Sequence, residues 1–321
     1  MSFKPIIVVA GEPYSVFLEI FFKTLKVKKI KKPIILIASY QLVVAQMKAL
    51  NFNFKINIIT KKIPQAKDLE NSAINMINVD FKFKKKFDKI SSKSNQYINK
   101  SFEIALNLLK TKKFSGLING PIAKKSFLAG KFLGITEYLA FKTNRKNKAT
   151  MLIYNKHLSV SPITTHLALK DVHKHISKKK ILIVVKHITD FYKQKFNKIP
   201  KIAITGLNPH CESNFKNCEE DLIIIPAIKK LKLENIKVDG PFPADTIFIK
   251  EHLKDYDVII GMYHDQVLSP MKALFNFDAI NITLGLPFVR ISPDHGPNTS
   301  MLGKNLSNPK SLMEALKFLD K

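Results

Sequence analysis

Short apolar runs that end at a turn or a polar cluster recur along the whole chain, and this pattern constrains the fold most. Residues 6–10 read IIVVA and precede Gly-Glu-Pro, and residues 34–38 read IILIA and precede a helix-period stretch. Further runs of this kind occupy residues 116–119, 201–205 and 258–260. Strands that alternate with helices in this way are typical of α/β proteins with largely parallel sheets.

Other stretches carry local predictions of structure. The pattern MLIYNKHLSVS after Thr150 indicates a hairpin, and residues 308–319 indicate an amphipathic helix that packs on the N-terminal sheet. Gly120-Pro121 indicates the start of a helix, and residues 240–246 indicate a rigid loop. The lysine-rich section from residue 60 to residue 93 is expected to form surface loops and short edge strands.

The length and composition set the scale of the protein. With 321 residues and 45% hydrophobic content, the chain suits one large or two medium α/β domains. No apolar run approaches the roughly 18 residues that a membrane span needs, and the first residues lack the apolar core of a signal peptide. We expect a cytoplasmic protein without a membrane partner. Cys211 and Cys218 form neither a CxxC pair nor a disulfide framework, which is compatible with a reducing compartment.

The formal net charge of +28 is compatible with a nucleic-acid partner, because basic surfaces attract phosphate backbones. However, all but two of the 53 Lys and Arg residues are lysines, and they are spread along the chain. Base readout and bidentate phosphate contacts rely on arginine, and neither a stacking motif nor a DNA-binding pattern is present. We therefore expect no specific nucleic-acid partner.

The densest group of polar candidates lies between residues 256 and 296. A strand pattern stops at Gly261, directly before the cluster Tyr263-His264-Asp265-Gln266. A second short strand carries Asn281 and leads to Arg290. Open α/β proteins bind their ligands beyond the carboxyl ends of strands. The segment therefore predicts a site for a small anionic ligand.

Charged and polar residues near these strand ends have chemical roles in this prediction. Lys272 and Arg290 would neutralise a phosphate or a carboxylate, and arginine offers a bidentate fork. Thr136 is a candidate N-cap or ligand contact. Asp245 is a candidate partner of a metal ligand or a cofactor contact.

Three histidines share a sequence context: His166, His210 and His264 each follow an apolar strand-like run and a polar or turn residue. All three could therefore point to the same edge of a sheet. Converging imidazoles would suit Zn²⁺ or a similar ion and leave coordination positions open for a substrate. The spacing alone leaves the alternative open, since single histidines are usually structural or exposed. His295 is ambiguous.

Eight motifs then establish a family resemblance that covers nearly the whole chain. They occur in the order seen in the 4-hydroxythreonine-4-phosphate dehydrogenase family, which the chain resembles. The motifs are Gly-Glu-Pro at Gly11, Gly-Pro-Ile-x-Lys at Gly120, Thr-Glu-Tyr-Leu-Ala at Thr136, Thr-Thr-His-Leu-x-Leu-Lys-Asp-Val at Thr164, Gly-Leu-Asn-Pro-His at Gly206, Tyr-His-Asp-Gln at Tyr263, Asn-Ile-Thr-Leu-Gly-Leu-Pro-Phe at Asn281 and Asp-His-Gly at Asp294.

The resemblance implies a fold and an assembly. It implies a homodimer of subunits with two α/β/α domains and an isocitrate-dehydrogenase-like architecture, with the active site in the interdomain or dimer cleft. We expect residues 1–125 and 300–321 to form the first domain. Residues 126–299 are then expected to form the second domain, which carries the metal ligands and the dimer interface.

The resemblance also implies an activity. This is the NAD- or NADP-dependent oxidation of 4-hydroxy-L-threonine 4-phosphate, followed by loss of CO₂, which gives 3-amino-2-oxopropyl phosphate for pyridoxal 5'-phosphate (vitamin B6) biosynthesis. One divalent metal ion per subunit (Zn, Mg or Co) is expected to assist. The chain contains no GxGxxG motif, so the nicotinamide cofactor follows from the resemblance, and the residues that bind it are not identified.

The resemblance assigns site residues by position. The metal ligands are His166, His210 and His264, and the substrate contacts are Thr136, Lys272, Asn281 and Arg290. We expect Lys272 and Asp245 to be the catalytic residues.

The chain departs from the family pattern at several positions. Ile135 stands where the family usually has a histidine that contacts the substrate, and Cys211 and Pro297 stand in altered motifs. A related dehydrogenase of a four-carbon sugar-acid phosphate, threonate or erythronate 4-phosphate, is therefore an alternative. A basic binding protein that keeps the fold without catalysis is an alternative of another class.

Overall fold

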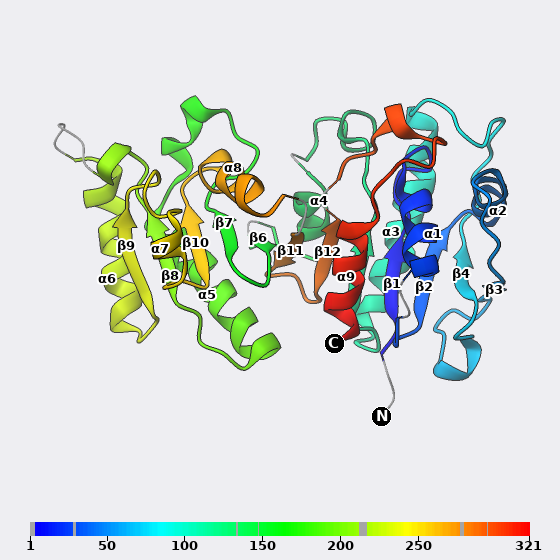
Figure 1. Cartoon of the computed structure of the whole chain (residues 1–321), viewed down its shortest axis with the longest axis horizontal. Coiled ribbons are helices and arrows are strands. Elements are labelled where there is room, and N and C mark those ends of the chain that lie inside the picture. Colours follow the sequence, from blue (N-terminus) through cyan, green and yellow to red (C-terminus); the bar gives the residue numbers. More distant parts are fainter. Residues whose placement is uncertain are drawn as a thin grey trace. The chain divides into compact units, whose positions relative to one another are not determined.

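The computed structural model describes residues 4–27, 30–132, 134–146, 148–211, 217–276, 279–293 and 295–321, and the chain forms two compact units (Figure 1). Unit 1 comprises Met1–Leu139 and Pro287–Lys321, and unit 2 comprises Ala140–Leu286. The sequence-based limits, 1–125 with 300–321 and 126–299, differ from these at both changeovers. As a result, Thr136 and Arg290 belong to unit 1 in the structure.

Unit 1 contains a parallel sheet with the strand order β3-β4-β2-β1-β5-β12. Its strands are β1 (Ile6–Val9), β2 (Ile34–Ala38), β3 (Ile56–Ile58), β4 (Ile74–Asn78), β5 (Gly116–Asn119) and β12 (Arg290–Pro293). β1 and β5 are buried along their whole length, as expected of parallel strands covered on both faces.

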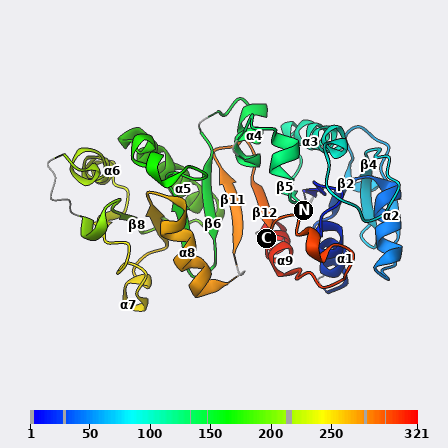
Figure 2. The same ribbon diagram turned by 90° about the horizontal axis from the view of Figure 1, so that it is seen from above.

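Helices cover both faces of this sheet. They are α1 (Phe17–Val27), α2 (Tyr40–Ala49), α3 (Asn95–Lys110) and α9 (Lys310–Asp320), together with the start of α4 (Ile135–Lys142). Figure 2 shows α3 on one side of the strands and α1 and α9 on the other. α9 buries Leu312, Leu316 and Leu319 against the sheet, and each such burial contributes roughly 1.5–3 kcal/mol. The predicted C-terminal helix is thereby confirmed.

Unit 2 contains strands in the order β11-β6-β7-β10-β8-β9. They are β6 (Thr150–Tyr154), β7 (Ser159–Pro162), β8 (Ile202–Thr205), β9 (Val238–Phe242), β10 (Val258–Gly261) and β11 (Ile280–Leu284). β6 runs antiparallel to β7 and β11, which confirms the predicted hairpin, and β7, β10, β8 and β9 are parallel. The strand pairings within each unit confirm the predicted, mostly parallel α/β class.

The helices of unit 2 also form two layers. They are α5 (Lys178–Phe196), α6 (Ile225–Leu233), α7 (Lys250–Leu253) and α8 (His264–Phe275). Figure 2 shows α5 and α6 on one side of the strands and α7 and α8 on the other. Short helical turns occupy Ala66–Asp68, Ser92–Ser94, Lys124–Leu128, Leu169–Asp171, His173–His175, Pro209–Cys211, Glu220–Ile224 and Thr299–Met301. Among the described residues, no helix has the length and apolar composition that crossing a membrane requires.

Three local predictions were wrong. β4 is an interior strand between β2 and β3, with Met76 fully buried, where surface loops and edge strands were expected. Residues 240–242 belong to β9 and not to a loop, because an edge strand tolerates the proline of Gly240-Pro241. The helix expected at Gly120-Pro121 begins only at Lys124, as a short π-helical turn.

Candidate functional site

A buried arginine organises the carboxyl end of β5 in unit 1. Arg290 is 1% exposed; its Nε donates to Asn119 Oδ1 at 2.8 Å, and its Nη1 donates to Thr136 Oγ1 at 3.4 Å. Asn119 is the last residue of β5, the parallel neighbour of β12, and Thr136 lies in the first turn of α4. One guanidinium therefore joins a strand end to a helix start, and it unites two of the four predicted substrate contacts.

The surroundings of Arg290 change the pKa of its guanidinium. Burial lowers its pKa to about 10, and the nearby carboxylate of Glu137 opposes that shift. The guanidinium is therefore still cationic at neutral pH. Glu137 Oε2 is itself buried without a hydrogen-bond partner in the described part of the chain. A buried cation at a strand end is suited to hold an anionic group such as a phosphate or a carboxylate.

The three candidate metal ligands lie at one edge of the unit 2 sheet. β7, β10 and β8 are adjacent and parallel, so their carboxyl ends share an edge. His166 follows β7, His264 begins α8 directly after β10, and His210 follows β8. The order of the strands places His264 at the end of the middle strand of the three.

The structure brings two of these histidines together. The rings of His166 and His264 lie with their centroids 5.8 Å apart at an interplanar angle of 38°. His264 Nδ1 lies 2.6 Å from Asp265 Oδ1, which leaves Nε2 as the nitrogen that can face a ligand. His166 and His210 are exposed, and the His264 side chain is 34% exposed. Across the residues that the structure describes, no group of three His, Cys, Asp or Glu side chains could hold a metal ion as placed.

Lys272 and Asn281 lie in unit 2, on α8 and on β11, which follow one another in the sequence. Lys272 is half-buried on α8, about two helical turns after His264, and burial lowers its pKa. Asn281 pairs with Ile153 in the β11–β6 ladder, and its Oδ1 is buried without a hydrogen-bond partner in the described ranges. A buried, unsatisfied amide oxygen is costly, so it is a natural acceptor for a ligand.

Asp245 is exposed in the segment after β9, the edge strand beside β8. Within the described residues, no contact joins it to another candidate. His295, which the sequence left ambiguous, stacks on Phe17 with ring centroids 6.4 Å apart, and burial lowers its pKa. Asp294, part of the same motif, lies outside the described residues.

Sequence reasoning missed two acidic residues. Glu137 directly follows Thr136, and its effect on the pKa of Arg290 could have been suspected from that adjacency. Glu220 is 1% exposed and accepts hydrogen bonds from the turn that precedes His210. No local pattern signals this contact, because its partners lie more than ten residues away in the sequence.

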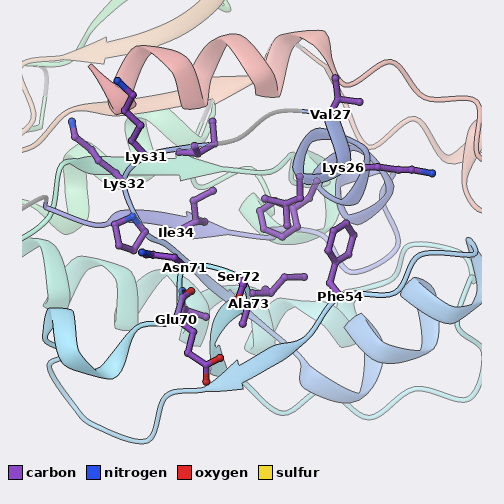
Figure 3. A pocket seen from close by; sticks show the side chains of 16 residues that line it. Lys26, Val27, Lys31, Lys32, Ile34, Phe54, Glu70, Asn71, Ser72 and Ala73 are labelled. Atoms are coloured by element: carbon purple, nitrogen blue, oxygen red, sulfur yellow. Dashed lines mark hydrogen bonds between the residues drawn. The ribbon is translucent and has the colours of Figure 1, made fainter.

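A hollow of about 430 Å³ lies elsewhere in unit 1, at the amino-terminal ends of β2 and β4 (Figure 3). Phe21, Ile34 and Phe54 contribute to its apolar wall. Two of its charged residues engage their own chain: Lys32 Nζ donates to the Leu319 carbonyl, and Glu70 pairs with Lys55 at 2.6 Å. None of the predicted site residues lines it, so we place the functional site at the strand ends.

The strand order and the helical layers define an α/β protein with an isocitrate-dehydrogenase-like fold. Isocitrate dehydrogenase from Methylococcus capsulatus superposes with a TM-score of 0.51 over 98% of this chain and 83% of that chain. The sequence identity is 9%, so this likeness shows the fold alone.

The chain belongs to the family described as pyridoxal phosphate biosynthetic protein PdxA, whose model matches residues 29–319. It is 39% identical over 267 residues to a protein of Sulfurihydrogenibium sp. (strain YO3AOP1) named 4-hydroxythreonine-4-phosphate dehydrogenase, covering 82% of each chain. It is 34% identical over 235 residues to the D-threonate 4-phosphate dehydrogenase of Cupriavidus necator, covering 72% of this chain and 70% of that one.

A solved structure supports the same membership. The 4-hydroxythreonine-4-phosphate dehydrogenase of Klebsiella pneumoniae superposes with a TM-score of 0.86 at 27% identity, covering 99% of this chain and 97% of that chain. Membership of this family makes the chain an oxidoreductase.

Proposed function

We propose that this enzyme oxidises and decarboxylates 4-hydroxy-L-threonine 4-phosphate with NAD or NADP, giving 3-amino-2-oxopropyl phosphate for pyridoxal 5'-phosphate biosynthesis. The observation that carries the proposal is the buried Arg290, one of two arginines in the chain, held by Asn119 and Thr136. This cation stands at a strand end in a chain whose residues 29–319 match the family. A phosphorylated substrate could form a charge-assisted hydrogen bond with this cation.

We further propose that His166, His210 and His264, at one edge of the unit 2 strands, would hold one divalent metal ion (Zn²⁺, Mg²⁺ or Co²⁺). His166 and His264 are already close, and the contact of His264 Nδ1 with Asp265 presents the other nitrogen outward. His210 at the same edge would be the third ligand. Such an ion, when bound, lowers the pKa of a coordinated alcohol and stabilises the charge left by loss of CO₂ from a β-keto acid.

The remaining candidates take binding and proton-transfer roles in this proposal. Arg290 and Thr136 bind the phosphate or carboxylate, and the buried Asn281 Oδ1 accepts a hydrogen bond from the substrate. Lys272, whose pKa is lowered by burial, exchanges a proton more readily near neutral pH than an exposed lysine does. Asp245 is the proposed carboxylate of the site, either as a catalytic residue or as a partner of a metal ligand.

D-threonate 4-phosphate is the alternative substrate, because Ile135 replaces the histidine usual in the family and the Cupriavidus necator relative is named for that substrate. Ile135 is half-buried at the first position of α4, beside Thr136. The ratio of kcat/KM values for the two substrates decides between them. Restoring the histidine in Ile135→His is expected to shift the ratio toward 4-hydroxy-L-threonine 4-phosphate by about tenfold, the value of one hydrogen bond.

We also propose a cytoplasmic homodimer. Its support is the family resemblance, and light scattering of the purified protein would test the assembly.

The decisive experiment follows NADH absorbance with 4-hydroxy-L-threonine 4-phosphate and NAD, before and after chelation and restoration of a divalent ion. We expect turnover that requires the metal and disappears in His210→Ala. A fully metallated protein that turns over neither this substrate nor threonate or erythronate 4-phosphate would favour the non-catalytic binding protein.

A further inference from the structure

A buried polar network lies beneath the turns that carry the three histidines. Its first member is Gln266, which is 8% exposed in the first turn of α8. Gln266 Oε1 accepts hydrogen bonds from Thr205 Oγ1 at 3.0 Å and from the Met262 N–H at 2.6 Å. Its Nε2 donates to the Gly206 carbonyl at 2.7 Å. A single amide side chain therefore joins the end of β8 to the end of β10.

The network extends to β7 through the backbone of Met262. Thr164 Oγ1 donates to the Met262 carbonyl at 2.7 Å, and the Thr164 N–H donates to the same carbonyl at 3.1 Å. Thr164 stands two residues before His166. The ends of all three strands that lead to histidines are thus bonded to one another through Met262 and Gln266.

The second member of the network is Glu220, in the π-helical turn that precedes α6. Its Oε1 accepts from the N–H groups of Leu207 at 2.7 Å and Asn208 at 2.9 Å, and its Oε2 accepts from Asn208 Nδ2 at 2.9 Å. Burial raises the pKa of Glu220, but the hydrogen bonds from Asn208 and Leu207 outweigh burial and lower it overall. An ionised carboxylate therefore fixes the turn directly before Pro209 and His210.

This turn has a backbone that needs support. His210 has φ 57° and ψ 11°, in the left-handed region that residues other than glycine rarely adopt, and Cys211 has φ 59°. Such conformations persist only where the surroundings hold them, and they gather at functional sites. Glu220 stabilises this turn through its hydrogen bonds to Leu207 and Asn208. Gln266 stabilises the residue at its start through its hydrogen bond to the Gly206 carbonyl.

We propose that Glu220 and Gln266 are positioning residues that hold His210 and His264 ready to share one metal ion. Neither side chain contacts the substrate or the ion; each acts through the strand end that it binds. This inference rests on the metal site of the proposed function. Outer hydrogen-bond partners of metal ligands typically change metal affinity by about 10- to 100-fold when they are lost.

Titration of the full-length, metal-free protein with Co²⁺ tests the inference. The visible absorption of bound Co²⁺ reports both its affinity and its coordination geometry. We expect Glu220→Ala and Gln266→Leu to weaken Co²⁺ binding by about 10- to 100-fold and to alter the absorption bands. Glu220→Gln is expected to recover part of the affinity, because its amide oxygen still accepts from the two backbone N–H groups but not from Asn208 Nδ2.

Tyr192→Phe is the matched control. It removes a buried hydrogen bond to Ser159 Oγ, 2.9 Å long, at the amino-terminal end of β7 and thus at the opposite edge of the same sheet. We expect it to lower the melting temperature without changing Co²⁺ affinity or spectrum. If a structural role alone were involved, Glu220→Ala, Gln266→Leu and Tyr192→Phe would all leave Co²⁺ affinity and spectrum unchanged.

The possible outcomes distinguish failure of the positioning role from failure of the proposed metal site. Wild-type protein that binds Co²⁺ through His210, alongside folded Glu220→Ala and Gln266→Leu variants with unchanged affinity and spectrum, would overturn the positioning role. Wild-type protein that binds no Co²⁺ would overturn the metal site, and the inference with it.

Discussion

The arginine cluster of unit 1 and the histidine edge of unit 2 differ in how complete they are. Arg290 is 1% exposed, and core contacts to Asn119 and Thr136 fix its guanidinium. The His264 side chain is 34% exposed, and the described residues contain no three-ligand group. The folded chain therefore holds the proposed anion-binding arginine in place, whereas the proposed metal-binding histidines are partly or fully exposed.

The largest expected effect tests the histidine edge of unit 2. His264→Ala should lower kcat/KM by about 10³-fold or more, because a metal ion supplies several kcal/mol of charge stabilisation. Fold stability should change little, since the side chain is partly exposed. Initial rates and metal content are the measurements. His252→Ala, an exposed histidine on α7, is the control, and equal activity in the two variants would contradict the metal assignment.

Arg290→Lys tests the arginine cluster of unit 1. The lysine keeps the charge but lacks the planar fork that bonds Asn119 and Thr136 together, so we expect kcat/KM to fall by about 10²- to 10³-fold. Because the proposed role of Arg290 is to bind the substrate rather than to react, most of the loss should appear as a raised KM. Arg145→Lys, at the only other arginine and exposed, is the matched control. Activity within threefold of wild type would remove Arg290 from the site.

Asn281→Leu separates function from stability. The Oδ1 atom of Asn281 has no hydrogen-bond partner in the described residues, so its replacement by an apolar group of similar size should leave the melting temperature equal or raise it. The same change should lower kcat/KM by about 10- to 100-fold. A clear fall in melting temperature with unchanged activity would show that the amide serves the fold alone.

The smallest expected effect is on stability: the change in melting temperature caused by Lys272→Met should depend on pH. Burial lowers the pKa of Lys272, so its charged form is disfavoured in the folded state. The folded protein then loses this proton at a lower pH than the unfolded chain, and wild-type stability recovers as pH rises from the lowered pKa toward 10.5. The methionine variant should therefore gain a few degrees in melting temperature at neutral pH, and the gain should shrink as pH rises.

Lys229→Met, at an exposed lysine of α6, is the control for this pH series. It should show no gain at any pH. A gain for Lys272→Met that grows with rising pH would contradict the assigned direction of the pKa shift.

The sequence predicted those parts of the fold that depend on local apolar pattern. Strands β1, β2, β5, β8 and β10 each contain a short apolar run. The parallel pairing of β7, β10 and β8 places the three histidines at one edge. Sequence reasoning missed β12, because that strand opens with a charged residue, and β9, because Gly-Pro resembles a turn.

The same reasoning explains what could be predicted of the site. The candidate ligands were visible as residue types after strand ends. The supporting bonds were not, because Gln266 reaches Thr205 and Gly206 across about sixty residues of sequence. Burial of Arg290 beneath α4 likewise depends on tertiary packing, which no local pattern encodes.

The most direct test compares substrate binding and turnover in the same metal-free sample. Isothermal calorimetry would measure the affinity for 4-hydroxy-L-threonine 4-phosphate before and after a divalent ion is restored, and NADH absorbance would measure turnover. A preformed anion anchor predicts that metal-free protein still binds the substrate within about tenfold of the metallated affinity yet forms no NADH. Loss of all binding on metal removal, or NADH formation without metal, would contradict the account.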